Sequence, residues 1–301
     1  MEYAAVLSPE LRAFIAESEA LTPSGLAADD WAAVRAAYDR MAAQMHLGRP
    51  KDLVVFDTQI SGVGVRVYGD APTDTRPVTV IYAHGGGFVV GDLDSHDDLC
   101  AEISDRTALQ VISVDYRLAP EHQHPAAYND LAAVVQAVCA QGPVVLTGDS
   151  AGATLCAALL GTLGDWPIDA TRIRGQVLIY PLLGYEPRGG SFDIHADAPL
   201  LSRDDLAVYA AARGGDPDDP RATPASGDLR ALPPTRLFAS QCDPLCDDAT
   251  RYAEAAKTAG ADVFCVTQIG TVHGWLRARA RSPELAAQFT EIVEAIRDLA
   301  R

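Results

Sequence analysis

The residues best suited to chemistry surround Ser150, in the stretch GPVVLTGDSAGATLCAALL. Gly148, Ser150 and Gly152 fit the pattern G-x-S-x-G, with a short apolar run before them and a helical pattern after them. In a sharp turn from strand to helix, side chains at both glycine positions would collide with neighbouring backbone, and the serine hydroxyl is exposed. The spacing therefore predicts a nucleophilic serine at position 150. A serine that only caps a helix is the alternative interpretation.

A second motif lies in IYAHGGGFVVG, residues 81–91, where three consecutive glycines follow His84. A serine that attacks a carbonyl creates an oxyanion, which is best stabilised by backbone N–H groups in a fixed site. The residue after the nucleophile and a glycine loop after an earlier strand supply such groups. We therefore expect Gly86, Gly87 and Ala151 to form an oxyanion hole. A phosphate-binding loop is excluded, because the stretch has neither GK[ST] nor G-x-G-x-x-G. A flexible turn alone would not require three glycines.

A serine hydroxyl is a weak nucleophile without a general base. Among the seven histidines, His273 follows the last apolar run, in IGTVHGW, and is the expected base. A histidine with satisfied surface hydrogen bonds is the alternative. Asp243 comes first after the preceding apolar run, in SQCDPLCDD, and is expected to accept the imidazole N–H and stabilise the imidazolium. Asp247 and Asp248 compete for this role, but their positions are more typical of helix caps.

Short apolar runs alternate with helical patterns through most of the chain. The apolar runs are Val78–Tyr82, Val111–Val114, Val144–Leu146, Gln176–Tyr180, Arg236–Ala239 and Val263–Val266. The helical patterns lie near 98–107, 128–140, 151–163, 247–259 and 284–300. Continuously apolar strands that alternate with helices predict a mostly parallel sheet covered on both faces. Chemistry in such a sheet occurs beyond the carboxyl ends of the strands. A period of two around Val63–Val67 predicts an additional hairpin or edge strand.

Two segments interrupt this alternation. Residues 1–45 are expected to form two helices, the first opened by Ser8-Pro9-Glu10 and the second running from Ala28 to Met45. Residues 183–234 contain no clear strand and hold a glycine-rich stretch followed by a helical pattern over Ser202–Arg213. A long insertion between two strands is usually functional, typically as a lid.

The composition limits the classes of partner. The chain has 301 residues and a net charge of −17, so no basic face for nucleic acid or for an anionic membrane surface is expected. No apolar run is long enough to span a membrane, and the N-terminal residues show no secretory pattern, which predicts a cytoplasmic protein. The six cysteines are scattered, and Cys242 and Cys246 form one loose pair without a second pair. We expect reduced thiols and no metal site.

Taken together, HGGGF, DYRLAPEH at 115–122, GDSAG at 148–152, DPLCD at 243–247 and HGW at 273–275 resemble the hormone-sensitive-lipase-like esterases. The order serine, acid, histidine is that of the α/β-hydrolase fold. The resemblance covers the chain from about residue 50 to its end. It implies an α/β-hydrolase fold with a mostly parallel sheet, flanking helices and a helical cap. The implied catalytic domain comprises residues 46–183 and 226–301, and the implied cap comprises residues 1–45 and 184–225.

The resemblance further implies a serine carboxylesterase that hydrolyses short-chain acyl esters through an acyl-enzyme, without metal or cofactor. It also suggests a homodimer formed through an edge strand. A deacetylase or amidase that acts on a small acylated metabolite would use the same triad. A hydrolase-fold protein that only binds a small molecule is a third hypothesis, but such proteins have often lost the base.

The resemblance also implies roles for residues outside the triad. His84 is expected to orient the oxyanion loop. The charged residues of DYRLAPEH, which are Asp115, Arg117 and Glu121, are expected to form a buried structural network. Cys246 stands where the family pattern has arginine, which weakens a local ion pair and leaves the triad untouched.

Overall fold

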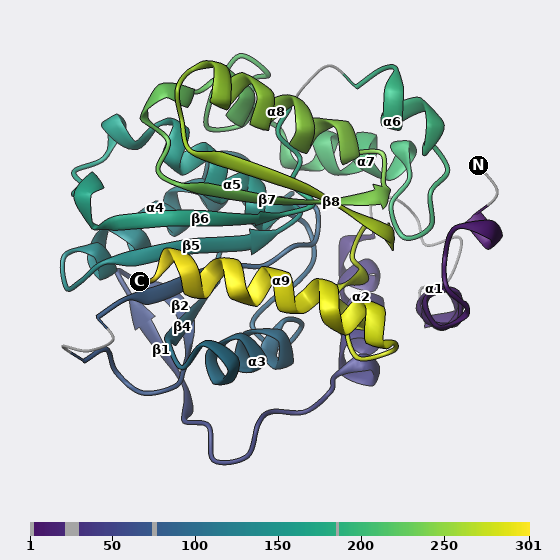
Figure 1. The fold of residues 1–301 in the computed structure, drawn as a ribbon, viewed down its shortest axis with the longest axis horizontal. Coiled ribbons are helices and arrows are strands. Elements are labelled where there is room, and N and C mark those ends of the chain that lie inside the picture. Colours follow the sequence, from purple (N-terminus) through teal and green to yellow (C-terminus); the bar gives the residue numbers. More distant parts are fainter. Residues whose placement is uncertain (1–2, 22–29, 74–76, 185–186) are drawn as a thin grey trace.

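An eight-stranded sheet forms the centre of the molecule (Figure 1) in a computed structural model that describes residues 3–21, 30–73, 77–184 and 187–301. The strands are β1 Val55–Ile60, β2 Val63–Tyr68, β3 Thr79–Ala83, β4 Gln110–Asp115, β5 Val144–Asp149, β6 Ile173–Ile179, β7 Thr235–Cys242 and β8 Val263–Val272. Their spatial order is β1-β2-β4-β3-β5-β6-β7-β8. Only β1 with β2 and β2 with β4 pair antiparallel among these strands, so the expected mostly parallel sheet is confirmed.

Helices cover both faces of the sheet. The α-helices are α1 Pro9–Leu21, α2 Trp31–Met45, α3 Asp97–Thr107, α4 Ala126–Cys139, α5 Ala151–Gly161, α6 Gly190–Ile194, α7 Arg203–Arg213, α8 Cys246–Thr258 and α9 Pro283–Leu299. The core on one face includes residues of α4, α5 and α8, and the core on the other includes residues of α3 and α9. None of the described helices is both long and apolar enough to cross a membrane.

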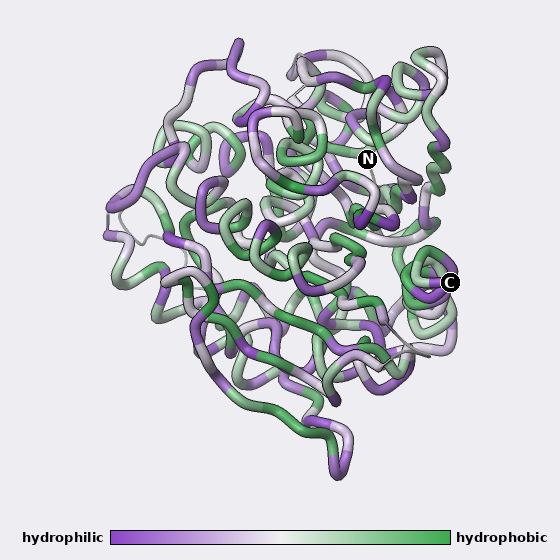
Figure 2. Tube along the Cα trace, turned by 90° about the vertical axis from the view of Figure 1, so that its left-hand side faces the viewer, coloured by the Kyte–Doolittle hydropathy of each residue, from purple (hydrophilic) through white to green (hydrophobic). Residues whose placement is uncertain are grey.

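The two-sided cover explains why the strands have continuous apolar sequences. In β3, Ile81 and Ala83 belong to the core beneath α5, whereas Val80 and Tyr82 belong to the core beneath α9. All four are fully buried, because side chains that alternate in direction meet a helical layer on either face. Figure 2 shows the result, with hydrophobic segments through the interior and hydrophilic residues concentrated in the outer turns.

Most predicted elements are found within a few residues of their expected bounds, and the exceptions are local. The second helix begins at Trp31 after Asp30, whose side chain accepts a hydrogen bond from the Ala33 N–H at 3.1 Å. Residues 28 and 29 of its expected span lie outside the described residues. The sequence did not indicate α6, a short helix inside the glycine-rich stretch. Strand β8 extends beyond its apolar run to Val272, directly before His273.

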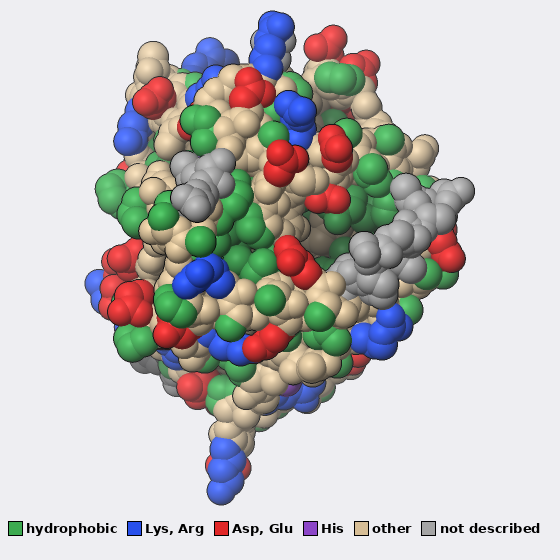
Figure 3. Space-filling model, turned by 90° about the vertical axis from the view of Figure 1, so that its right-hand side faces the viewer, with side chains coloured by type: hydrophobic (Ala, Val, Ile, Leu, Met, Phe, Trp, Pro, Cys, Tyr) green, Lys and Arg blue, Asp and Glu red, His purple; other side chains and the backbone are tan. Residues whose placement is uncertain are grey.

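The carboxyl ends of the parallel strands lie on the side of the molecule where α1, α2, α6 and α7 are found (Figure 1). Figure 3 looks onto this side and shows a hollow with hydrophobic side chains in its walls and acidic side chains at its rim. Ser150, Asp243 and His273 all follow the ends of strands that point in this direction. The fold thus delivers the predicted reactive residues to one end of the sheet.

A buried ion pair connects Arg279, in the segment that follows His273, to helix α3. The Arg279 guanidinium lies 2.7 Å from Asp98 and 2.7 Å from Glu102, and Arg279 is only 3% exposed. Burial tends to raise the pKa of Asp98, but Arg279 outweighs this effect and holds that pKa below its usual value. The charges of Arg279 and Asp98, both nearly buried, therefore depend on each other for compensation.

We predict that Arg279→Met lowers the free energy of unfolding by about 3–5 kcal/mol, because it leaves the Asp98 carboxylate buried without its charged partner. Urea unfolding followed by circular dichroism measures the change. The matched control is Glu102→Gln, which removes the more exposed acid of the cluster and should cost no more than about 1 kcal/mol. Equal losses in the two variants would contradict the account.

Candidate functional site

Ser150 occupies a sharp turn between β5 and α5. Its backbone angles are φ 51° and ψ −120°, a conformation that residues with a side chain rarely adopt. A Cβ atom on Gly148 would lie 2.5 Å from the Ala83 carbonyl oxygen, and one on Gly152 would lie 1.9 Å from it. The glycines are therefore required by the close approach of β3. The Ser150 side chain makes no capping hydrogen bond to α5, so the helix-cap interpretation is wrong.

Asp243 and His273 meet Ser150 from the ends of β7 and β8. His273 Nε2 lies 2.7 Å from Ser150 Oγ, and His273 Nδ1 lies 2.7 Å from Asp243 Oδ2. Asp243 is fully buried, and its other oxygen accepts a hydrogen bond from the Leu245 N–H at 2.8 Å. Because a carboxylate can only accept, Nδ1 carries the proton, and Nε2 is free to accept the serine proton. The structure brings together the three residues that the sequence singled out.

The glycine loop that follows β3 has a backbone that only glycine accepts readily. Gly86 and Gly87 have φ values of +123° and +59°, and a Cβ atom on Gly86 would lie 2.2 Å from the Val90 carbonyl oxygen. Within the part of the chain that the structure describes, the N–H groups of Gly86, Gly87 and Ala151 donate to no protein acceptor. These groups are available to an oxygen atom of a ligand.

Asp149 connects the serine turn to the glycine loop. Its carboxylate accepts hydrogen bonds from the Gly85 N–H at 2.9 Å and from the Tyr82 hydroxyl at 2.7 Å, and His96 Nε2 lies 3.3 Å away. Burial raises the pKa of Asp149, but His96 and the hydroxyl donors outweigh burial and hold that pKa well below its usual value. Asp149 thus holds the backbone at the start of the glycine loop. Its partner His96 lies in a segment that carries no sequence motif.

The side chain of His84 contacts the backbone of the same loop. Its Nδ1 lies 2.8 Å from the Gly85 carbonyl oxygen, and its ring stacks on Tyr116 with 4.2 Å between the ring centroids. Burial lowers the pKa of His84 to about 4, so the ring is neutral at pH 7. The surroundings of His84 agree with the expected role in orienting the loop.

The expected buried network in DYRLAPEH is wrong. Asp115, Arg117 and Glu121 are all exposed. Arg117 pairs with Asp130 at 2.7 Å, and Glu121 pairs with Arg35 at 2.6 Å, so the charges serve separate contacts at the surface. The motif buries its aromatic and small residues, because these face the core while charged side chains retain contact with water.

The expectation that Asp247 and Asp248 cap a helix is also wrong. Asp248 Oδ2 accepts hydrogen bonds from the backbone N–H groups of Leu183 at 2.9 Å and Gly184 at 3.1 Å. Asp247 Oδ2 accepts one from the Ser191 N–H at 2.9 Å. Burial raises the pKa of Asp248 to about 6. Both acids anchor the segment after β6, and neither bonds to the triad histidine.

A metal site would need several His, Cys, Asp or Glu side chains close together. All six cysteines are free, and four of them are buried. Among the described residues, no three or more His, Cys, Asp or Glu side chains are grouped as they would be around a metal ion.

Comparisons with known proteins give the relatives of the chain. Residues 80–277 match the family model described as alpha/beta hydrolase fold. The chain is similar to esterase LipI of Mycobacterium tuberculosis, with 34% identity over 75% of this chain and 76% of the relative. It is also similar to carboxylic ester hydrolase LipN of the same organism, with 32% identity over 97% of this chain and 82% of the relative.

Solved structures give the same result. A crystal structure of an esterase from the bacterial hormone-sensitive lipase family superposes with a TM-score of 0.86 and 27% identity. The match covers 98% of this chain and 99% of the other. The similarity therefore includes the helices that precede β1 as well as the sheet.

We predict that Gly152→Ala destabilises the protein by about 1–3 kcal/mol or more, because its methyl group would overlap the Ala83 carbonyl and force β3 and α5 apart. Gly164→Ala is the control, since a Cβ atom there meets nothing within 4 Å. Thermal unfolding of the two variants measures the difference. Unchanged stability in Gly152→Ala would show that the turn does not need its glycine.

Proposed function

Since the chain belongs to the hormone-sensitive-lipase-like esterases of the α/β-hydrolase fold, we propose that it hydrolyses short-chain carboxylic esters through an acyl-serine intermediate. The observation that carries the proposal is the hydrogen-bonded series Ser150, His273 and Asp243, with 2.7 Å at each of its two links. A nucleophile, a base and an acid that orients the base are the groups that ester hydrolysis requires.

In the first half of the reaction, His273 Nε2 takes the proton of Ser150 as Oγ attacks the ester carbonyl carbon. Asp243 keeps the imidazole in place and stabilises the imidazolium. The N–H groups of Gly86, Gly87 and Ala151 bind the oxyanion of the tetrahedral intermediate. His273 then returns the proton to the departing alkoxide, the C–O bond breaks, and an alcohol leaves while the acyl group stays on Ser150.

In the second half, water takes the place of the alcohol. His273 accepts a proton from the water molecule as it attacks the acyl carbon, and the same N–H groups bind the second oxyanion. The proton passes to Ser150 Oγ as the acyl bond breaks, and the carboxylic acid is released. The chain's own groups carry every proton and charge, so the proposal includes no metal or cofactor.

The proposed cap comprises residues 1–45 and 184–225, and the proposed catalytic domain comprises 46–183 and 226–301. Support comes from the apolar cluster in which Tyr38 of α2 and Tyr209 of α7 pack against Val89 and Val90, next to the glycine loop. Two distant segments thus cover the same part of the site. We propose that they restrict the length of the acyl chain.

Two further features of the proposal concern the protein's surroundings. Strand β8 lies at the edge of the sheet, and its Phe264 and Ile269 are 54% and 64% exposed, which supports a homodimer formed through this edge. The free thiols support a cytoplasmic location, where cysteines stay reduced. The net charge of −17 opposes binding to nucleic acid, which leaves small esters as the expected partners.

We predict that p-nitrophenyl esters from acetate to palmitate are hydrolysed with a maximum at short chains, and that Ser150→Ala lowers kcat by on the order of 10⁴–10⁶. Release of p-nitrophenol measures both. A Ser150→Ala variant as active as wild type would contradict the role of Ser150. An inactive wild type would favour a binding protein.

A matched pair of an ester and an amide with the same acyl group separates the esterase from the amidase hypothesis. The proposal requires faster turnover of the ester. A preference for the amide, or for N-acetyl groups, would assign the same triad to a different substrate class.

A further inference from the structure

We infer that the glycine loop is held in its anion-binding shape by two positioning residues, Arg35 of α2 and Arg213 of α7. The inference rests on the proposed function, since it gives these arginines a role in the same reaction. Neither arginine belongs to a motif in the sequence, and each comes from a segment far from the loop.

Arg35 joins the glycine loop to the segment that follows β4. Its Nε donates to the Val89 carbonyl oxygen at 2.8 Å, and its Nη2 donates to the Ala119 carbonyl oxygen at 2.8 Å. The other side of the guanidinium meets the Glu121 carboxylate in a two-pronged contact, at 2.9 and 2.6 Å. The planar fork of arginine presents two nitrogen atoms in fixed directions, one to each carbonyl group, whereas lysine has a single nitrogen atom.

The two residues whose carbonyl groups Arg35 binds are themselves hydrogen-bonded to the glycine loop. The N–H groups of Val89 and Val90 both donate to the Gly86 carbonyl oxygen at 3.0 Å, and the Ala119 N–H donates to the Phe88 carbonyl oxygen at 2.9 Å. A displacement of Val89 would therefore move Gly86 with it. Arg35 thus binds two residues whose N–H groups hydrogen-bond to Gly86 and Phe88, on either side of Gly87.

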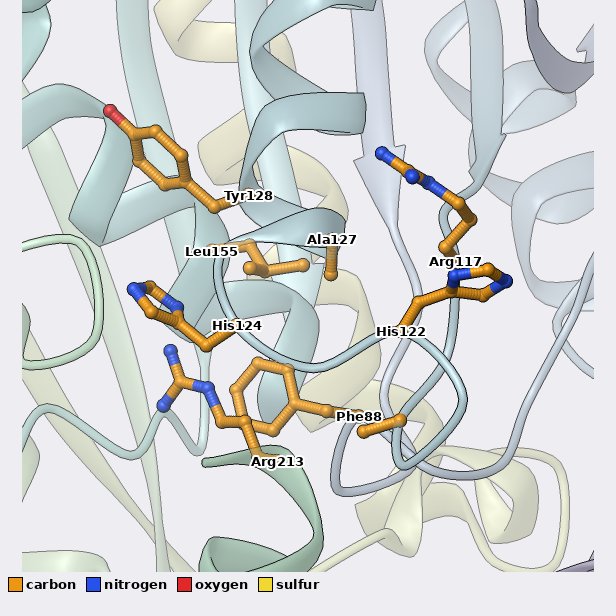
Figure 4. A pocket seen from close by; sticks show the side chains of 9 residues that line it. Phe88, Arg117, His122, His124, Ala127, Tyr128, Leu155 and Arg213 are labelled. Carbon is orange, nitrogen blue, oxygen red and sulfur yellow. The ribbon is translucent and has the colours of Figure 1, made fainter. Parts of the chain in front are cut away.

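Arg213 contacts Phe88, the residue before Val89 in the turn. Its guanidinium carbon lies 4.0 Å from the centroid of the Phe88 ring, and Figure 4 shows the two side chains next to each other beside His124. Phe88 has a φ of +68°, which is strained for a residue with a large side chain. Arg213 is 8% exposed, and its Nη1 donates to the Ala222 carbonyl oxygen at 3.1 Å. Burial lowers its pKa to about 10, so the cation persists at pH 7.

A second residue of helix α7, Tyr209, packs closely against Gly87. A Cβ atom on Gly87 would lie 2.6 Å from the ring of Tyr209. Consecutive residues of the turn are therefore contacted by α2 or α7: Gly87 by Tyr209, Phe88 by Arg213 and Val89 by Arg35. The loop has its present shape only while both helices are docked on it, which links the proposed cap to the rate of the chemical step.

The direct test compares Arg35→Met with Glu121→Gln. Methionine keeps the aliphatic part of the side chain but removes every donor, whereas Glu121→Gln leaves both bonds to the carbonyl groups in place. With p-nitrophenyl butyrate, we expect Arg35→Met to lower kcat by roughly 10–100-fold, because a misplaced oxyanion donor loses most of its effect. KM should change by less than about twofold, since the ground state gains little from these donors. Glu121→Gln should stay within about twofold of wild type in both constants.

A second readout separates positioning from a loss of folded protein. A trifluoromethyl ketone with a short alkyl chain forms a hemiketal with the serine, and its oxyanion needs the same N–H groups. Its affinity for Arg35→Met should fall by the same factor as kcat. Arg213→Met should show the same pattern, and Arg213→Lys should recover part of the loss, because lysine keeps a cation over the Phe88 ring.

The outcomes are distinct. Wild-type kcat in Arg35→Met, or a raised KM with unchanged kcat, overturns the inference and leaves the esterase in place. An inactive wild type overturns both. If Arg35→Met does not fold, Arg35→Lys takes its place, and wild-type values of kcat and ketone affinity in that variant overturn the inference.

Discussion

The contact between the ends of β3 and β5 is the constraint on which the site depends. The two strands run parallel, with Ala83 opposite Gly148. Because Gly148 and Gly152 have no side chains, the Ala83 carbonyl approaches the serine turn far more closely than a Cβ atom would allow. The serine turn therefore continues β5, and the glycine loop continues the neighbouring strand β3. The register between these two strands sets the position of one loop relative to the other.

A buried charge reinforces this contact. The Asp149 carboxylate belongs to β5 and binds the Gly85 N–H at the start of the glycine loop. A buried carboxylate is costly unless its oxygens are paired, and His96 together with tyrosine hydroxyls supplies the partners. Arg277 donates a hydrogen bond to the Tyr38 hydroxyl at 2.9 Å, which connects α2 to the segment that follows His273. Polar groups that take no direct part in the proposed chemistry thus fix the geometry that the chemistry needs.

Much of the fold could be predicted from the sequence, because the relevant signals are local. Continuous apolar runs identify strands buried on both faces, and the glycines around Ser150 indicate a close approach of backbone that the structure contains. The site's supporting contacts could not be predicted in the same way. Arg35 and Arg213 look like ordinary charged residues of two helices, and only the tertiary structure places them on one loop. The same limit explains the errors at Asp247 and Asp248, where position at a helix start suggested caps but a neighbouring segment provides the partners.

The most direct test of the account is the site at which the protein is covalently modified. Diethyl p-nitrophenyl phosphate transfers its phosphoryl group to an activated serine and releases p-nitrophenol, and the resulting phosphoserine ester hydrolyses slowly. The account predicts one equivalent of p-nitrophenol per chain, with the modification in the peptide that contains Ser150 and none in Ser150→Ala. Modification of another residue, or ester turnover in a protein that the reagent does not modify, would contradict the account.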